Sequence, residues 1–157
     1  MIEIVLLSNM ENKQLRVSEV KLTYRNRIKP SDRIVIKGPQ DAFEVLWNAY
    51  DKDTIEHTEE MKMLLLDRGN KVLGIASISK GGTTGTVIDI KVILQYALKA
   101  NAHSIILAHN HPSGNLNPSE TDIKITDRVK EACKLVELTL YDHLIITPEG
   151  KWNSIID

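Results

Sequence analysis

Residues 103–122 read HSIILAHNHPSGNLNPSETD and hold the strongest fold signal in the chain. His103 to Ala108 is short and almost wholly apolar, which predicts a strand buried within a sheet. Asn110 to Pro118 contains Pro and Gly and predicts a loop. Ser119 to Val136 carries apolar residues at helical spacing and predicts a helix. This part of the chain is therefore expected to run from a buried strand through a loop into a helix.

Similar signals lie on both sides. Met61 to Leu66 predicts a buried strand, and the turn residues 67–70 connect it to a second strand over Val72 to Ile78, which makes a hairpin. Asp89 is suited to cap a helix, whose expected apolar face is Ile90, Ile93, Leu94, Ala97 and Leu98. Leu138 to Ile146 predicts a further strand, followed by a turn and a short tail. Strands that alternate with helices predict an α/β domain in which helices flank a mixed β-sheet.

Residues 1–58 differ in character from the rest of the chain. Leu15, Val17, Val20 and Leu22 alternate with polar residues in a strand-like pattern. Asp41 to Tyr50 shows apolar residues at helical spacing, with Asp41 as the expected N-cap. We interpret 1–58 as an N-terminal extension packed on a main domain of residues 59–157.

The overall composition limits the class of protein. The chain has 157 residues, of which 42% are hydrophobic and 26% charged, as is ordinary for one globular domain. A formal net charge of −1 offers no strong field for nucleic acid, although Met10 to Arg33 is basic enough to leave a local contact open. Cys133 is the single cysteine, which fits a reducing compartment. No apolar run approaches the about 20 residues that span a bilayer, so we expect a cytoplasmic protein without membrane contact.

Two histidines end the buried strand. His109 and His111 are two residues apart and would project to the same side. Asp122 falls in the first helical turn, where a carboxylate is favoured in its ionised form. Imidazole and carboxylate both suit zinc, which catalytic sites bind through three protein ligands. The three side chains therefore predict a zinc site, provided that the loop turns back on itself.

A reading without metal explains some of the same residues. Ser119, followed three residues later by Asp122, is typical of a helix-capping pair, and Pro118 fits a helix entrance. Loop histidines can also be plain surface side chains. The position of the histidines, directly after a buried strand and opposite a helix N-terminus, favours the metal site.

The spacing of His109, His111, Ser119 and Asp122 resembles the JAMM metalloprotease motif, also called MPN+ or JAB. The string HNHPSGNLNPSETD resembles the RadC-like branch of that family. The resemblance extends to Gly81-Gly82-Thr83, Asp89 and Asp142-His143, and it covers roughly residues 59–155. It implies a JAB/MPN layered fold similar to that of cytidine deaminases.

The resemblance also implies a set of roles. His109, His111 and Asp122 would bind Zn²⁺ with water in the fourth position, and Ser119 would help to stabilise the oxyanion. If Ser119 caps the helix, its side chain is not fully available for that second role. Characterised JAMM proteins hydrolyse peptide or isopeptide bonds, whereas the RadC-like branch carries a DNA-repair label.

An upstream glutamate would act as the general base, with Glu56, Glu59 and Glu60 as candidates. Glu59 matches the family pattern. In a strand, Glu59 would share its face with the apolar residues Met61, Met63 and Leu65, whereas Glu60 would share the other face with Lys62. A carboxylate on an apolar face needs a reason, and a buried site supplies one. The argument requires the strand to begin at or before residue 60.

Three functions remain open from the sequence. The leading one is a zinc-dependent hydrolase that cleaves an amide bond in a protein or peptide substrate. The alternatives are a DNA-associated protein that uses the same metal site, and a metal-free scaffold; the oligomeric state stays open. Among other side chains near the motif, His143 is expected to support the site or the fold and not to bind the ion, and Asn110, Ser113 and Thr126 are candidates for hydrogen bonds around the metal.

Overall fold

The computed structural model describes residues 18–81 and 88–156. Within these residues the strands form one five-stranded sheet in the order β2-β1-β3-β4-β5. The bounds are η1 (Pro30–Asp32), α1 (Pro39–Trp47), β1 (Glu60–Leu66), β2 (Val72–Lys80), α2 (Ile90–Lys99), β3 (Ser104–Asn110), α3 (Glu120–Lys134), β4 (Thr139–Ile146) and β5 (Trp152–Ser154).

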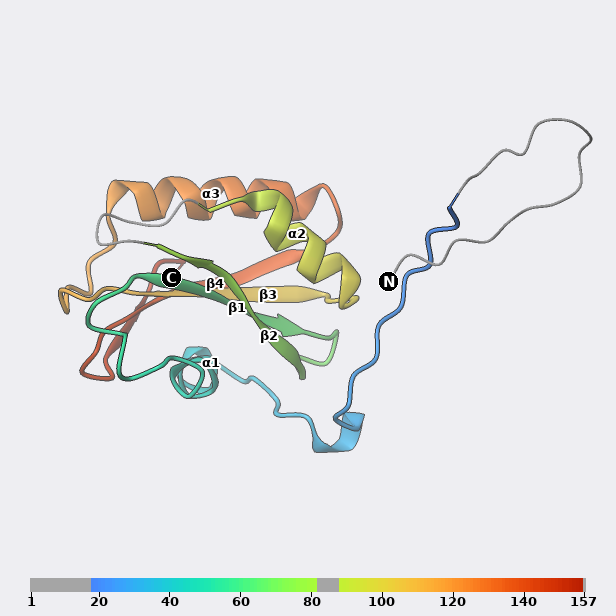
Figure 1. The fold of residues 1–157 in the computed structure, drawn as a ribbon, viewed down its shortest axis with the longest axis horizontal. Helices are drawn as coiled ribbons and strands as arrows, with labels where there is room; N and C mark the ends of the chain where they lie inside the picture. Colours follow the sequence, from blue (N-terminus) through green and yellow to red (C-terminus); the bar gives the residue numbers. More distant parts are fainter. Residues whose placement is uncertain (1–17, 82–87, 157) are drawn as a thin grey trace, which may run out of the picture.

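The sheet is mixed, as the sequence predicts. Neighbouring strands are antiparallel except for β3 and β4, which run parallel. Helices α2 and α3 cover one face of the sheet and α1 covers the other (Figure 1). The α/β prediction is confirmed, as are the hairpin of β1 and β2 and the cap of α2, where the Asp89 side chain accepts a hydrogen bond from Lys91 N.

Alternating side chains of β1 build two apolar cores. Met61, Met63 and Leu65 pack beneath α2 and α3. Leu64 and Leu66 pack on the opposite face with α1, in a cluster that also takes in Ile36, Ala42, Phe43, Leu46, Tyr50 and Ile55. Residues 36–55 therefore share a core with the sheet, while the division of the chain at residue 58 stays a prediction.

The central strand β3 positions the functional stretch. All of Ser104–Asn110 is buried, because β1 and β4 pair with it on its two sides and helices cover both faces. Parallel strands need a crossover connection, which α3 provides between β3 and β4. The end of β3 and the start of α3 are joined by a loop of residues 111–119, so both lie at the same edge of the sheet.

Two local predictions are wrong, and the structure adds a strand in the predicted tail. Helix α1 begins at Pro39 after the N-cap Gly38, so Asp41 lies inside the first turn and its Oδ2 accepts from Lys37 N at 2.7 Å. Pro39 explains this earlier start, because proline is suited to the first helical position. Leu98 is 51% exposed and leaves the apolar face of α2 near the end of the helix. The predicted tail contains β5, which pairs with the end of β4.

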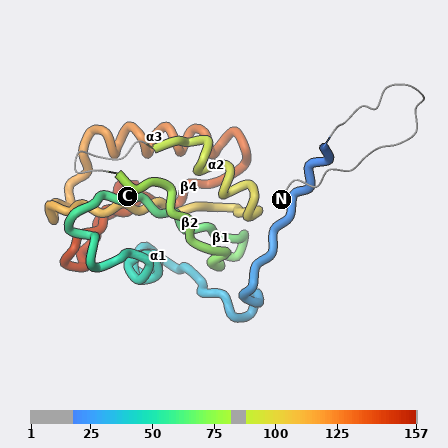
Figure 2. The backbone as a smooth tube through the Cα atoms, viewed as in Figure 1, coloured from blue at the N-terminus to red at the C-terminus, as the bar shows by residue number. Residues whose placement is uncertain are grey.

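The predicted strand around residues 15–22 is not formed where the structure describes it. Val20 and Leu22 are exposed and lie outside any strand, and Leu15 and Val17 lie outside the described residues. The segment before η1, blue in Figure 2, runs outside the layers of the domain. It is held to β2 where Asn26 Nδ2 donates to Leu73 O at 2.8 Å.

Cys133 lies on the core-facing side of α3 and is fully buried. Burial raises the pKa of its thiol to about 11. Because the thiolate is the reactive form, we expect a disulfide reagent at pH 8 to modify native Cys133 more than about 100-fold more slowly than the unfolded chain, where the pKa is near 8.5. Absorbance of the released thiolate measures both rates. Equal rates would contradict burial of this thiol.

Candidate metal centre

Three ligand-type side chains meet at the edge of the sheet where β3 ends and α3 begins. We call His109, His111 and Asp122 the His–His–Asp cluster; their ligand atoms all lie within 4.8 Å of one another. The two Nε2 atoms are 2.9 Å apart, His109 Nε2 lies 3.3 Å from Asp122 Oδ1, and His111 Nε2 lies 3.6 Å from Asp122 Oδ2. Ligands of one tetrahedral ion at bond lengths of 2.0–2.1 Å stand about 3.3 Å apart. The cluster therefore has the spacing of a metal site.

The loop after β3 fixes the direction of His111. Its backbone N–H donates to Ile146 O of β4 at 2.8 Å, which holds the residue at the sheet edge. Gly114, at φ 78°, turns the chain back, and Asn115 O then lies 2.6 Å from His111 Nδ1. A carbonyl oxygen only accepts, so Nδ1 carries the proton and Nε2 of the neutral ring faces the cluster as an acceptor.

Asp122 serves the helix and the cluster at once. Its Oδ2 accepts from Ser119 N and from Ser119 Oγ, both at 2.7 Å, while Asp122 N donates to Ser119 Oγ at 3.1 Å. Burial alone would raise the pKa of Asp122, but the adjacent His109 and His111 rings and the Ser119 hydroxyl hold it well below its usual range. The carboxyl is therefore ionised, which is the form that binds metal.

The two readings of Ser119 and Asp122 thus hold together, because the carboxylate caps the helix and faces both imidazoles. The Ser119 hydroxyl donates its proton to Asp122 Oδ2. A role for Ser119 at an oxyanion stays a prediction, since the hydroxyl would have to turn from this bond toward a substrate.

The structure places Glu59 and Glu60 on opposite faces of the sheet. Glu60 begins β1, and its carboxylate is 3.0 Å from Lys62 Nζ, so it belongs to the face under α1. The β1–β3 register places Met61 opposite His109, and Glu59 precedes the strand on that same side. The adjacent Asp122 carboxylate is the main reason that the pKa of His111 is raised, and the charge of Glu59 makes the smallest of the contributions to the rise. Glu59 therefore acts on the cluster, and its role as a base stays a prediction.

The side chains expected to support the site differ in what they contact. His143 Nε2 lies 2.8 Å from His109 Nδ1, and His143 Nδ1 lies 2.6 Å from Thr126 Oγ1. Asn110 instead holds the chain before β1: its amide donates to Ile55 O and Thr58 O, and its Oδ1 accepts from Glu60 N. Ser113 is exposed, and its Oγ accepts from Asn115 N at 3.4 Å.

Sequence reasoning did not find the carbonyl of Asn115, since no residue type marks a backbone acceptor. It also left open which atoms His143 contacts. The Asp142-His143 pair after α3 gave a signal for that residue, but the β3–β4 register needed to place it is a long-range feature.

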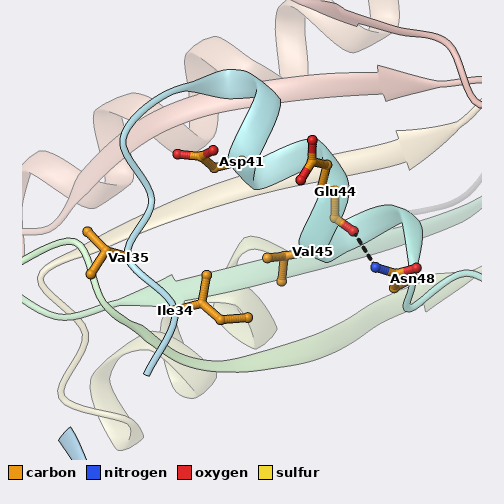
Figure 3. Close-up of a pocket in the computed structure, with 6 residues that line it drawn as sticks. All are labelled: Ile34, Val35, Asp41, Glu44, Val45 and Asn48. Atoms are coloured by element: carbon orange, nitrogen blue, oxygen red, sulfur yellow. Dashed lines mark hydrogen bonds between the residues drawn. The ribbon is translucent and has the colours of Figure 1, made fainter. Parts of the chain in front are cut away.

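A cavity of about 350 Å³ lies elsewhere, beside α1 (Figure 3). Its lining residues are Ile34, Val35, Asp41, Glu44, Val45 and Asn48. None of them belongs to the His–His–Asp cluster. The chemistry-bearing side chains are therefore separate from this hollow.

Comparison with protein-family models matches residues 36–157 to the RadC-like JAB domain. The matched range contains the whole His–His–Asp cluster and more than half of the chain. The chain belongs to the RadC-like JAB domain family. The match starts before α1, so the RadC-like JAB domain takes in the helix that covers the second face of the sheet.

Curated relatives carry the name UPF0758 protein. The RadC-like JAB chain is 40% identical over 122 residues to that of Flavobacterium johnsoniae, covering 78% of this chain and 52% of the relative. It is 44% identical over 99 residues to that of Porphyromonas gingivalis, covering 63% and 44%. With that of Aquifex aeolicus the identity is 40% over 122 residues, covering 78% and 51%. The chain spans about half the length of these relatives.

No helix in the described parts of the chain is long and apolar enough to cross a membrane.

Proposed function

We propose that this RadC-like JAB domain is a zinc-dependent hydrolase that cleaves an amide bond in a protein or peptide. The observation that carries the proposal is the convergence of two imidazole nitrogens and an ionised carboxylate at tetrahedral spacing. Two nitrogens and one oxygen are the ligand types of catalytic zinc sites, which keep a fourth position open. Membership of the JAB family, in which hydrolases are common, supports the same reading.

Each residue then has a defined task. A bound zinc ion supplies Lewis-acid polarisation of a carbonyl group and of water near neutral pH. Glu59, on the cluster's side of β1, would take a proton from the attacking water and return it to the leaving amine. Ser119 would donate a hydrogen bond to the oxygen on which negative charge develops. His109, His111 and Asp122 would hold the ion.

Zinc content tests the metal site directly. After dialysis against zinc, elemental analysis of the purified protein is expected to give one zinc per chain, and His109→Ala or Asp122→Ala to remove it, because two ligands hold zinc poorly. Asp127→Ala is the matched control, since Asp127 is an exposed carboxylate on the same helix. Equal zinc in Asp122→Ala and Asp127→Ala would contradict the site.

The reaction is tested on the zinc-loaded protein with fluorogenic peptides and with peptides joined through a lysine ε-amine. Cleavage that stops on chelation and returns with zinc supports the proposal. Cleavage of DNA by the same protein, without cleavage of either peptide set, would replace it with the nucleic-acid alternative. Both assays use the whole chain of 157 residues.

A further inference from the structure

A row of hydrogen bonds connects the ring of His109 to the backbone of Asp122. His109 Nδ1 lies 2.8 Å from His143 Nε2, and His143 Nδ1 lies 2.6 Å from Thr126 Oγ1. Thr126 Oγ1 in turn lies 2.6 Å from the carbonyl oxygen of Asp122. The three side chains are 1%, 0% and 4% exposed, so bulk water does not compete for these bonds. The row thus begins and ends at residues of the His–His–Asp cluster.

The carbonyl oxygen of Asp122, at the end of the row, determines which atom is the donor in each of its hydrogen bonds. The carbonyl oxygen of Asp122 only accepts, so the Thr126 hydroxyl donates its single proton there. Thr126 Oγ1 must then accept from His143 Nδ1. In a neutral ring the opposite nitrogen is an acceptor, so His143 Nε2 takes the proton of His109 Nδ1. His109 Nε2 is left with its lone pair facing the cluster.

The neutral state of His143 agrees with its surroundings. The His143 ring is fully buried, and burial disfavours the charged form of an imidazole. A neutral ring has two tautomers, and the Thr126 hydroxyl selects one of them.

We propose that Thr126 and His143 are positioning residues that fix His109 in the tautomer whose Nε2 is free to bind a metal ion. The inference rests on the proposed metal site and deepens it. Asn115 O does the same for His111, so both imidazoles point unprotonated nitrogens at the Asp122 carboxylate. Three acceptors then meet without a hydrogen between them, an arrangement that a cation satisfies.

Nuclear magnetic resonance reads the tautomers without any activity assay. Long-range ¹H–¹⁵N spectra of the zinc-free protein are expected to show His143 with its proton on Nδ1. Thr126→Ser keeps the hydroxyl and is expected to keep this pattern, whereas Thr126→Val is expected to give a mixture of tautomers. A proton on His143 Nε2 in the parent protein would overturn the inference.

Zinc affinity gives the second readout, measured by competition with a chromophoric chelator. Thr126→Val is expected to weaken zinc binding about 10–100-fold, as loss of a group that orients a ligand does, and Thr126→Ser to stay near the parent. Thr147→Val is the matched control, because Thr147 is also buried but its hydroxyl bonds to Lys151 in the turn after β4. An equal affinity in Thr126→Val and Thr147→Val would overturn the inference.

A second pair of variants tests the same inference if the Thr126→Val protein does not fold. His143→Gln keeps one acceptor and one donor, and His143→Leu keeps similar volume with neither. We expect His143→Gln to bind zinc more tightly than His143→Leu, and the reverse order would overturn the inference. A parent protein that binds no zinc would overturn the proposed function, while the spectra of the zinc-free protein would still decide the tautomer of His143.

Discussion

Glu59→Gln should leave zinc binding intact and lower the rate of amide hydrolysis by about 10²–10⁴-fold. The residue lies just before β1 on the side of His109, and it is not one of the three residues of the His–His–Asp cluster. Glutamine keeps the size of the side chain and removes the proton acceptor. Zinc content and the initial rate on the cleaved peptide, measured on the same preparation, separate the two effects.

Glu56→Gln is the matched control for this experiment. Glu56 is an exposed residue three positions earlier in the same segment, and we expect its replacement to leave both measurements unchanged. A Glu59→Gln protein that hydrolyses peptide at the parent rate would remove Glu59 from the reaction. One that loses its zinc would instead make Glu59 part of the metal site.

Asn110→Ala is expected to lower the free energy of unfolding by about 3 kcal/mol or more, because buried backbone groups left without partners cost about 1–3 kcal/mol each. The fully buried Asn110 amide donates to Ile55 O at 2.8 Å and Thr58 O at 2.9 Å and accepts from Glu60 N at 2.8 Å. Urea unfolding followed by circular dichroism measures the change.

The same bonds place Glu59, since its neighbours on both sides are tied to Asn110. Asn117→Ala is the matched control, because Asn117 is exposed in the loop before α3; a change within about 0.5 kcal/mol is expected. If both variants unfolded at the same urea concentration, the hydrogen bonds of Asn110 would not hold the segment before β1.

The parts of the fold that were predictable have strong local signals. An unbroken apolar run marks β3, and Pro118 and Ser119 mark the start of α3. The short strand β5 escaped prediction because Trp152–Ser154 is too brief to show alternation and depends on pairing with β4. The start of α1 was misplaced because Asp41 resembles a cap, while Gly38 and Pro39 begin the helix.

In the candidate site, too, local features were predictable and long-range contacts were not. His109, His111 and Asp122 could be expected to meet, because a strand end, a loop and a helix start fix their directions. The contact between His109 and His143 depends on the β3–β4 register, in which Leu107 pairs with His143. No local pattern sets that register, so the sequence could point to His143 without naming the atom that it touches.

The Asp122 carboxylate both caps α3 and faces two imidazoles. Binding of a cation at the cluster is therefore coupled to fraying of the first turn of α3. If the first turn opens, Asp122 loses its bonds to Ser119 and moves from the cluster. Suppose that a cation binds only when this turn is formed. The free energy by which it stabilises the formed turn then grows with the logarithm of the cation concentration, once that concentration exceeds the dissociation constant. Hydrogen exchange at the amide of Asp122 would then slow as the ion is added, so the start of this helix would report on the metal.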